Sequence, residues 1–164
     1  MKIFKRSLPV MLILMAIIAD VPVVSGQKQP TAKEIAITKL VDSQQYVFYA
    51  QYVIPSNGRQ RNLTSDYTVS VSKDTVTSDL PFFGRAYSAP INPGDGGIKF
   101  TSTNFSYKLE QRKKGGWIVT IKAPDAPGVQ QLNMTIFENG TASLLVTSTS
   151  RQPISFNGYI RGRK

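Results

Sequence analysis

The sequence predicts a small, mainly β domain in which an antiparallel meander closes into an up-and-down barrel or a strongly curved sheet behind one N-terminal α-helix. Three observations carry this prediction. From Tyr46 onward, apolar and polar residues alternate in many short segments, as strands with one buried face require. Turn residues separate these segments at short intervals. One segment before Tyr46 has helical spacing instead. A β-sandwich is the alternative fold.

The helix is predicted over residues 32–44. Thr31 and Glu34 have the spacing of a capping box, in which each side chain bonds the backbone amide of the other residue. The apolar residues that follow recur at helical spacing, which predicts one stripe that lies on a sheet or closes a barrel end. These residues are Ala36, Ile37, Leu40 and Val41.

About eight to ten strands are expected in sequential order, because period-two segments keep returning to the end of the chain. The first of them places five residues on one predicted face: Tyr46, Phe48, Ala50, Tyr52 and Ile54. Later segments repeat the pattern, for example Trp117, Val119 and Ile121. Closure of such a meander would remove its exposed edges.

Two hairpins can be placed in register, because paired strands must put their apolar faces on the same side of the sheet. A three-residue loop at Glu138-Asn139-Gly140 sets Ile136 opposite Ala142, Met134 opposite Leu144 and Leu132 opposite Val146. A similar loop at Lys113-Lys114-Gly115 sets Leu109 opposite Val119 and Tyr107 opposite Ile121. In both loops the glycine is expected in the left-handed conformation.

Residues 1–26 are predicted to be a cleavable signal peptide. Three basic residues among the first six precede an apolar stretch over residues 8–18, and small residues at 24–26 suit signal peptidase. A membrane-spanning helix is the rival interpretation, but it takes roughly 20 consecutive apolar residues, and proline and aspartate interrupt this stretch. We expect a periplasmic or secreted protein with no membrane span after cleavage. Without cysteine to accept a lipid, it is not expected to be a lipoprotein.

The remaining residues, 27–164, fit a single β domain that can bury one core without metals or disulfides. The full chain has a net charge of +10, and removal of the three basic residues and one acidic residue of the signal peptide leaves +8. Such an excess favours anionic partners, but it also keeps a small protein soluble. The basic residues form no nucleic-acid-binding motif, so we expect no nucleic-acid partner.

The sequence contains neither histidine nor cysteine. Their absence excludes Ser-His-Asp triads, thiol nucleophiles and histidine-based zinc sites, and we expect neither a cofactor nor a metal. A carboxylate pair could still catalyse hydrolysis, and Asp74 and Asp79 beside a turn are the candidates. Because surface carboxylates are routine at turns, the sequence favours a protein that is not an enzyme.

The segment Leu80-Pro81-Phe82-Phe83-Gly84-Arg85-Ala86-Tyr87 resembles an uncharacterised family of exported proteins from Gram-negative bacteria, catalogued as domain of unknown function 4251. Further segments occur in the family's order: Gly96-Gly97-Ile98-Lys99-Phe100, Lys114-Gly115-Gly116-Trp117, Asn139-Gly140-Thr141-Ala142 and Arg151-Gln152-Pro153-Ile154-Ser155-Phe156 with Gly158. The resemblance implies a calycin-like or lipocalin-like barrel and an exported protein, and it supplies no catalytic residues. Phe82 departs from the tyrosine often found there, which puts a polar role at this position in doubt.

The leading functional hypothesis is a binding module for a small apolar or anionic ligand. Aromatic residues of the barrel interior or rim, namely Phe83, Tyr87 and Trp117, would line its pocket. Arg85 or Arg151 would meet an anionic group. The opposing interpretation is that inward aromatic residues belong to the core, because a barrel of about eight strands can be filled by its own side chains.

Two other functions remain open. A structural or adaptor protein would present its helix or the loop 88–97 to a component of the cell envelope. A carboxylate-based hydrolase that uses Asp74 and Asp79 is the third hypothesis. The sequence supplies no specific motif for either function.

Overall fold

Helix α1 spans Ala32–Ser43 in the computed structural model, which describes residues 29–87 and 96–163. The predicted signal peptide and most of the loop 88–97 lie outside the described residues. The capping box is confirmed, because the Thr31 amide donates to Glu34 Oε2 (2.7 Å) and the Glu34 amide donates to Thr31 Oγ1 (3.2 Å). The helix ends as Gln44 adopts a left-handed conformation with φ 55°. Its buried residues Ile37 and Val41 belong to the core of the sheet.

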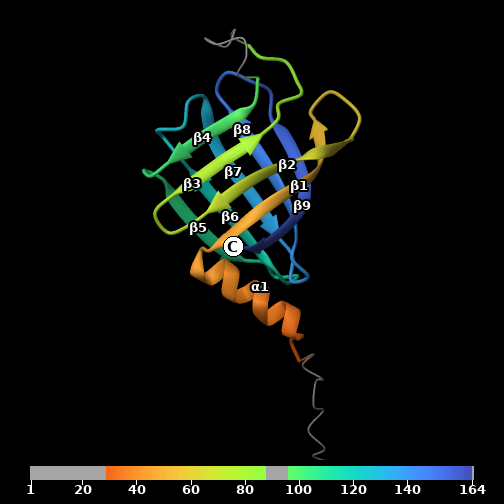
Figure 1. The fold of residues 1–164 in the computed structure, drawn as a ribbon, viewed down its shortest axis with the longest axis vertical. Helices are drawn as coiled ribbons and strands as arrows, with labels where there is room; N and C mark the ends of the chain where they lie inside the picture. The colour runs from red at the N-terminus through yellow and green to blue at the C-terminus, as the bar shows by residue number, and fades with distance from the viewer. Residues whose placement is uncertain (1–28, 88–95, 164) are drawn as a thin grey trace, which may run out of the picture.

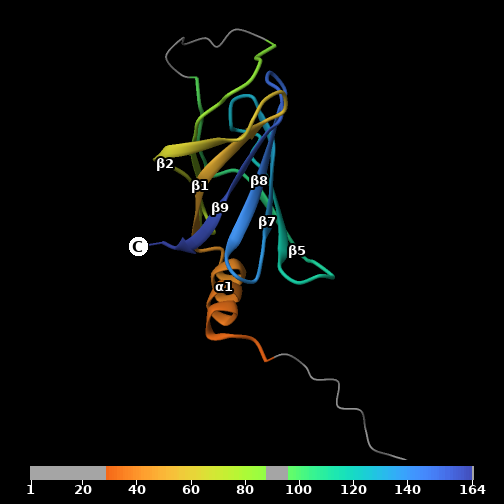
Figure 2. The same ribbon diagram turned by 90° about the vertical axis from the view of Figure 1, so that its right-hand side faces the viewer.

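The described residues form one antiparallel sheet of nine strands, which curls into a half-barrel with α1 beyond one end (Figures 1 and 2). The strands are β1 (Tyr46–Pro55), β2 (Arg61–Val71), β3 (Val76–Leu80), β4 (Ile98–Ser102), β5 (Ser106–Gln111), β6 (Trp117–Lys122), β7 (Val129–Ile136), β8 (Thr141–Ser148) and β9 (Ile154–Gly162). Their order in the sheet is β4-β3-β2-β1-β9-β8-β7-β6-β5. The predicted meander is therefore confirmed, with its first and last strands paired and its edges at β4 and β5.

The two edge strands are joined by a short turn that the loop between β6 and β7 supports. In this loop, Asp125 accepts a hydrogen bond from the Ser102 hydroxyl and another from the Asn104 amide (3.4 Å). The hydrogen bond from Ser102 is the main reason that the pKa of Asp125 lies below its ordinary value. Asp125 thus ties the loop between β6 and β7 to the turn that joins the two edge strands, β4 and β5.

Side chains of the sheet and helix fill the interior of the half-barrel. The largest fully buried residues include Tyr46, Phe48, Phe156, Leu80, Ile121, Leu132, Met134, Ile136, Leu144 and Ile154. The Tyr46 hydroxyl lies 3.3 Å from the Tyr107 hydroxyl, and burial raises the pKa of both groups. Because the interior is packed, a ligand is expected to bind on the outer surface.

The predicted registers of both hairpins are confirmed. Ile136 pairs with Ala142, Met134 with Leu144 and Leu132 with Val146. Leu109 pairs with Val119, and Tyr107 with Ile121. Gly140 (φ 83°) and Gly115 (φ 82°) occupy the left-handed positions, where a side chain would strain the backbone.

The predicted face of β1 is wrong beyond Ala50. Tyr46, Phe48 and Ala50 are buried as expected, but Tyr52 is 36% exposed and Val53 is buried in its place. The cause is an extra residue, Gln51, that has no partner on β9 between the pairs that Ala50 and Tyr52 form. A bulge of this kind shifts the alternation of a strand by one residue, so every later side chain changes face.

Candidate binding hollow on the outer face of β1 and β2

The ladder between β1 and β2 is interrupted at Gln51. Ala50 pairs with Tyr67, but the next pair joins Tyr52 to Asn62. Residues 63–66 of β2 therefore lie opposite a single residue of β1. They also extend past the end of β3, whose pairs with β2 begin at Thr68. This part of β2 is free to bow away from the sheet.

Gly158 on β9 permits the close approach that sets the bulge in β1. A Cβ atom at this position would lie 1.8 Å from the Tyr49 carbonyl oxygen and 2.9 Å from the carbonyl carbon. Glycine is the one residue that avoids this clash, because it has no Cβ. The backbone of β9 can thus stay paired with Ala50 while Gln51 leaves the ladder.

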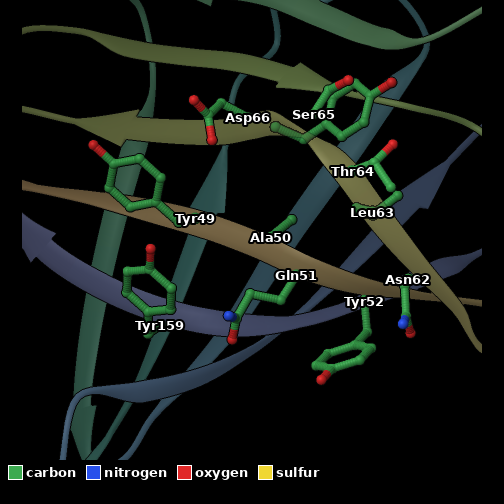
Figure 3. A pocket seen from close by; sticks show the side chains of 11 residues that line it. Tyr49, Ala50, Gln51, Tyr52, Asn62, Leu63, Thr64, Ser65, Asp66 and Tyr159 are labelled. Atoms are coloured by element: carbon green, nitrogen blue, oxygen red, sulfur yellow. The ribbon is translucent and has the colours of Figure 1, made fainter.

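A hollow of about 290 Å³, open to solvent, lies over the interruption. Its lining residues are Tyr49, Ala50, Gln51, Tyr52, Asn62, Leu63, Thr64, Ser65, Asp66, Tyr67 and Tyr159. Figure 3 shows Tyr49 and Tyr159 at one end, Tyr52 and Asn62 at the other, and Gln51 between them. The hollow thus draws its walls from three neighbouring strands, β9, β1 and β2.

One end of the hollow is a wall of two tyrosine rings. Tyr49 and Tyr159 face each other across β1 and β9, with ring centroids 5.4 Å apart and planes inclined by 16°. The Arg161 guanidinium lies 4.8 Å from the Tyr159 centroid. Stacking of this kind holds the rings in place, because offset rings and a cation on a ring face both attract electrostatically.

The rest of the lining is mainly polar and carries little charge. Amide groups come from Gln51 and Asn62, and hydroxyl groups come from Thr64 and Ser65. Asp66 is the one charged side chain among the described residues that line the hollow. With Arg161 at its border, the site presents one charge of each sign. It can form many hydrogen bonds with a neutral ligand.

This donor set suits binding better than catalysis. Hydrolysis by paired carboxylates needs two of them flanking the reacting bond, and among the described lining residues Asp66 is the only one. Within the described residues, no group of three or more His, Cys, Asp or Glu side chains is placed to hold a metal ion. Of the carboxylates proposed for a hydrolase, Asp79 bonds Lys99 (3.2 Å) on the exposed surface of β3 and β4, and Asp74 is exposed between β2 and β3.

Four of the five predicted site residues lie at the end of the sheet opposite α1. Ala86 and Arg151 form a bridge, the Tyr87 amide donates to the Ser150 carbonyl (2.7 Å), and the Gln152 amide donates to the Arg85 carbonyl (3.1 Å). Arg61 stands 5.3 Å from the centroid of the Phe83 ring. The structure therefore brings Phe83, Arg85, Tyr87 and Arg151 together on two adjoining segments, and none of the four lines the hollow.

The Arg151 side chain packs against neighbouring loop segments at this end of the sheet, which forms the rim of the half-barrel. Its Nη1 atom donates to the carbonyl oxygens of Gly96 (3.1 Å) and Gly97 (2.9 Å), and its guanidinium lies 5.1 Å from the Phe82 centroid. These contacts occupy the side chain with loop packing. Tyr87, by contrast, is 69% exposed.

Trp117, the fifth predicted residue, lies apart from the other four. It is buried where β6 begins and pairs with Ile136 at the end of β7. The turn that follows β7 contains Gly140, which packs against Ile37 of α1. Trp117 is thus a core residue at the helix end of the sheet.

A family model for a domain of unknown function, DUF4251, matches residues 28–160. The chain belongs to the DUF4251 family. The fold is similar to the crystal structure of a DUF4251 family protein from Bacteroides eggerthii DSM 20697, with a TM-score of 0.59 and 19% sequence identity. The match covers 79% of this chain and 87% of that one. A search of curated proteins found no match.

The hollow of this DUF4251 domain was not predicted from the sequence. Its signal is the presence of Tyr49 and Tyr159 on the outward side of their strands, where a solvated face would carry polar residues. The interruption opposite Gln51 has no comparable signal. In the described part of this DUF4251 chain, no helix is long and apolar enough to cross a membrane.

Proposed function

We propose that this DUF4251 domain is a non-enzymatic binding protein that acts outside the cytoplasm and holds a small polar ligand in the hollow between β1 and β2. The observation that carries the proposal is the hollow itself, which combines a fixed pair of tyrosine rings with amide, hydroxyl and carboxylate groups. Pockets that bind small molecules typically combine aromatic walls with a few convergent polar groups. Export rests on the sequence pattern of residues 1–26.

The hollow is favoured over the barrel interior and over the rim. Large buried side chains occupy the interior, so an apolar ligand would have to displace the core. At the rim, Arg151 bonds two carbonyl groups and packs on Phe82, which leaves it less able to meet an anion. The tyrosines of the hollow are held in place with their polar neighbours open to solvent.

The proposal can be tested by NMR titration of the protein with four probes of different chemistry: a neutral methyl glycoside, a zwitterionic amino acid, tetramethylammonium and inorganic phosphate. We expect at least one probe to give saturable shifts in the amide signals of residues 49–52 and 62–66. Ser65→Trp should abolish these shifts, because the exposed Ser65 lines the hollow and an indole would fill it.

Thr103→Trp is the matched control, since Thr103 is exposed in the turn between β4 and β5 and does not line the hollow. It should retain the shifts at full amplitude. Titrations in which no probe perturbs the hollow, or in which the shifts fall elsewhere, would overturn the proposal.

A further inference from the structure

We infer that the ligand of the hollow is a neutral saccharide, with one pyranose unit seated at the tyrosine wall. This inference rests on the binding function proposed above and names its ligand class. It follows from four features of the site: the fixed aromatic wall, the uncharged polar groups opposite it, the balance of charge and the volume.

The tyrosine wall suits a sugar ring because it is apolar and held in place. A pyranose carries C–H groups on its faces and hydroxyl groups around its edge, so one face can pack on an aromatic ring whose negative π-cloud attracts the C–H hydrogens. Tyr49 and Tyr159 are nearly parallel and are braced by Arg161. Little side-chain entropy is then lost when a ligand packs against them.

The edge of a sugar needs groups that can both donate and accept hydrogen bonds, because each hydroxyl does both. Gln51 and Asn62 carry amides, which have two donor hydrogens and one acceptor oxygen. Thr64 and Ser65 add hydroxyl groups, and Asp66 adds a strong acceptor. Gln51, Asn62, Thr64 and Ser65 lie beyond the tyrosine wall along the hollow, and Asp66 lies at its Tyr49 end (Figure 3).

The charge of the site argues against anionic and cationic ligands. Although the whole chain has a net charge of +10, the described residues at the site carry one charge of each sign, Asp66 in the lining and Arg161 at the border, so no net charge attracts an anion or a cation. A quaternary ammonium ion would suit a box of several aromatic faces. Tyr49 and Tyr159 instead form a single stack, which leaves a flat outer ring face for a ligand and no box, and the amide and hydroxyl groups would find no hydrogen-bonding partner on such an ion.

The size of the hollow fits a single unit. Its volume of about 290 Å³ is just below the range for pockets of drug-sized molecules, roughly 300–1,000 Å³. Because the hollow opens to solvent along the sheet surface, the rest of an oligosaccharide can continue outward. The site therefore suits a terminal or internal residue of a neutral glycan.

The test is a set of NMR titrations of the protein with methyl glycosides of glucose, galactose, mannose and N-acetylglucosamine, and with oligosaccharides of each. Choline and glucose 6-phosphate are the cationic and anionic comparisons. We expect neutral glycosides to shift the signals of residues 49–52 and 62–66, and choline to leave them unchanged. Glucose 6-phosphate should bind at least fivefold more weakly than the matching methyl glucoside.

Three variants assign the contacts. Tyr49→Ala should weaken glycoside binding at least tenfold, whereas Tyr49→Phe, which keeps the ring, should stay within threefold of the unaltered protein. Asn62→Ala changes an exposed lining residue and should weaken binding about fivefold without loss of the fold. Tyr87→Ala removes an exposed tyrosine at the rim and should have no effect.

The outcomes separate the two proposals. Glycoside shifts that Tyr49→Ala and Asn62→Ala weaken support both the binding function and the saccharide. Saturable shifts with choline or glucose 6-phosphate but with no neutral glycoside would overturn the saccharide and leave the binding function standing. If no compound perturbs the hollow, both proposals fail.

Discussion

Gly158→Ala tests whether the bulge in β1 requires a residue without a Cβ at this position of β9. The added Cβ would lie 1.8 Å from the Tyr49 carbonyl oxygen, about 1.6 Å closer than the 3.4 Å of an ordinary contact. The neighbouring atoms belong to backbone, so no rotamer change can relieve the overlap. β9 is also paired on both sides, with β1 and β8, and it cannot shift without disturbing one of these ladders.

The expected cost is at the upper end of that for overpacking, about 3 kcal/mol in the free energy of unfolding. For a domain of this size we expect the melting temperature to fall by roughly 10 °C. Differential scanning calorimetry and urea denaturation would measure the change. In the same variant, NMR signals of residues 49–52 should move, because the strands must separate where the hollow begins.

Gly58→Ala is the matched control. Its Cβ would lie 3.7 Å from Pro55 atoms, which is an ordinary contact, in the exposed turn between β1 and β2. Its melting temperature should change by no more than about 2 °C, as for most surface substitutions. Equal stability of the two variants would refute the argument that close approach of β9 to Tyr49 maintains the bulge.

Three further predictions concern hydrogen bonds that fix the ends and corners of the fold. The pKa of Asp125 is lowered in the fold, so the stability that its carboxylate contributes is present above the unfolded value of about 3.9 and is lost as the pH falls through the folded pKa. Thermal denaturation between pH 6 and pH 3 should therefore show that the stability of Asp125→Asn depends less on pH than that of the unaltered protein. The raised pKa values of Tyr46 and Tyr107 predict the opposite sign: stability is present below about pH 10 and lost above it, and alkaline denaturation should show a smaller loss in Tyr46→Phe. At neutral pH the same variant should lose about 1 kcal/mol, as the Tyr107 hydroxyl loses its partner. Thr31→Ala removes the cap of α1 and should cost about 1 kcal/mol by urea denaturation, whereas an unchanged midpoint would show that packing of Ile37 and Val41 suffices.

The sequence was sufficient to predict the elements whose cause is local. A capping box acts within four residues, and the loops at Gly115 and Gly140 combine a glycine that tolerates positive φ with apolar faces that allow only one register. The pairing of β1 with β9 agrees with the predicted closure of a meander. The signals for the capping box and for the two loops each lie within a short stretch of chain.

The bulge and the hollow could not be predicted in this way, because their causes lie on three strands that are far apart in sequence. Nothing around Gln51 marks an extra residue, since the alternation of β1 reads without interruption through Tyr52 and Ile54. The shift depends on Gly158, more than 100 residues later, and on the bowed residues 63–66 of β2. The predicted site residues at the rim were chosen as aromatic and basic, and most of their contacts serve loop packing.

The positive charge of the chain and the proposed binding site are separate features. Among the described residues, four arginines lie over aromatic rings, and three of the rings, Phe82, Phe83 and Phe137, lie outside the hollow. Attraction of exposed charges is screened within about 8 Å at physiological ionic strength, whereas stacking and hydrogen bonding to a neutral sugar are not. A rise in salt should therefore weaken any association of the basic surface with anions and leave binding at the hollow unchanged. If added salt instead weakened binding at the hollow, the basic excess, and not the tyrosine wall, would select the ligand.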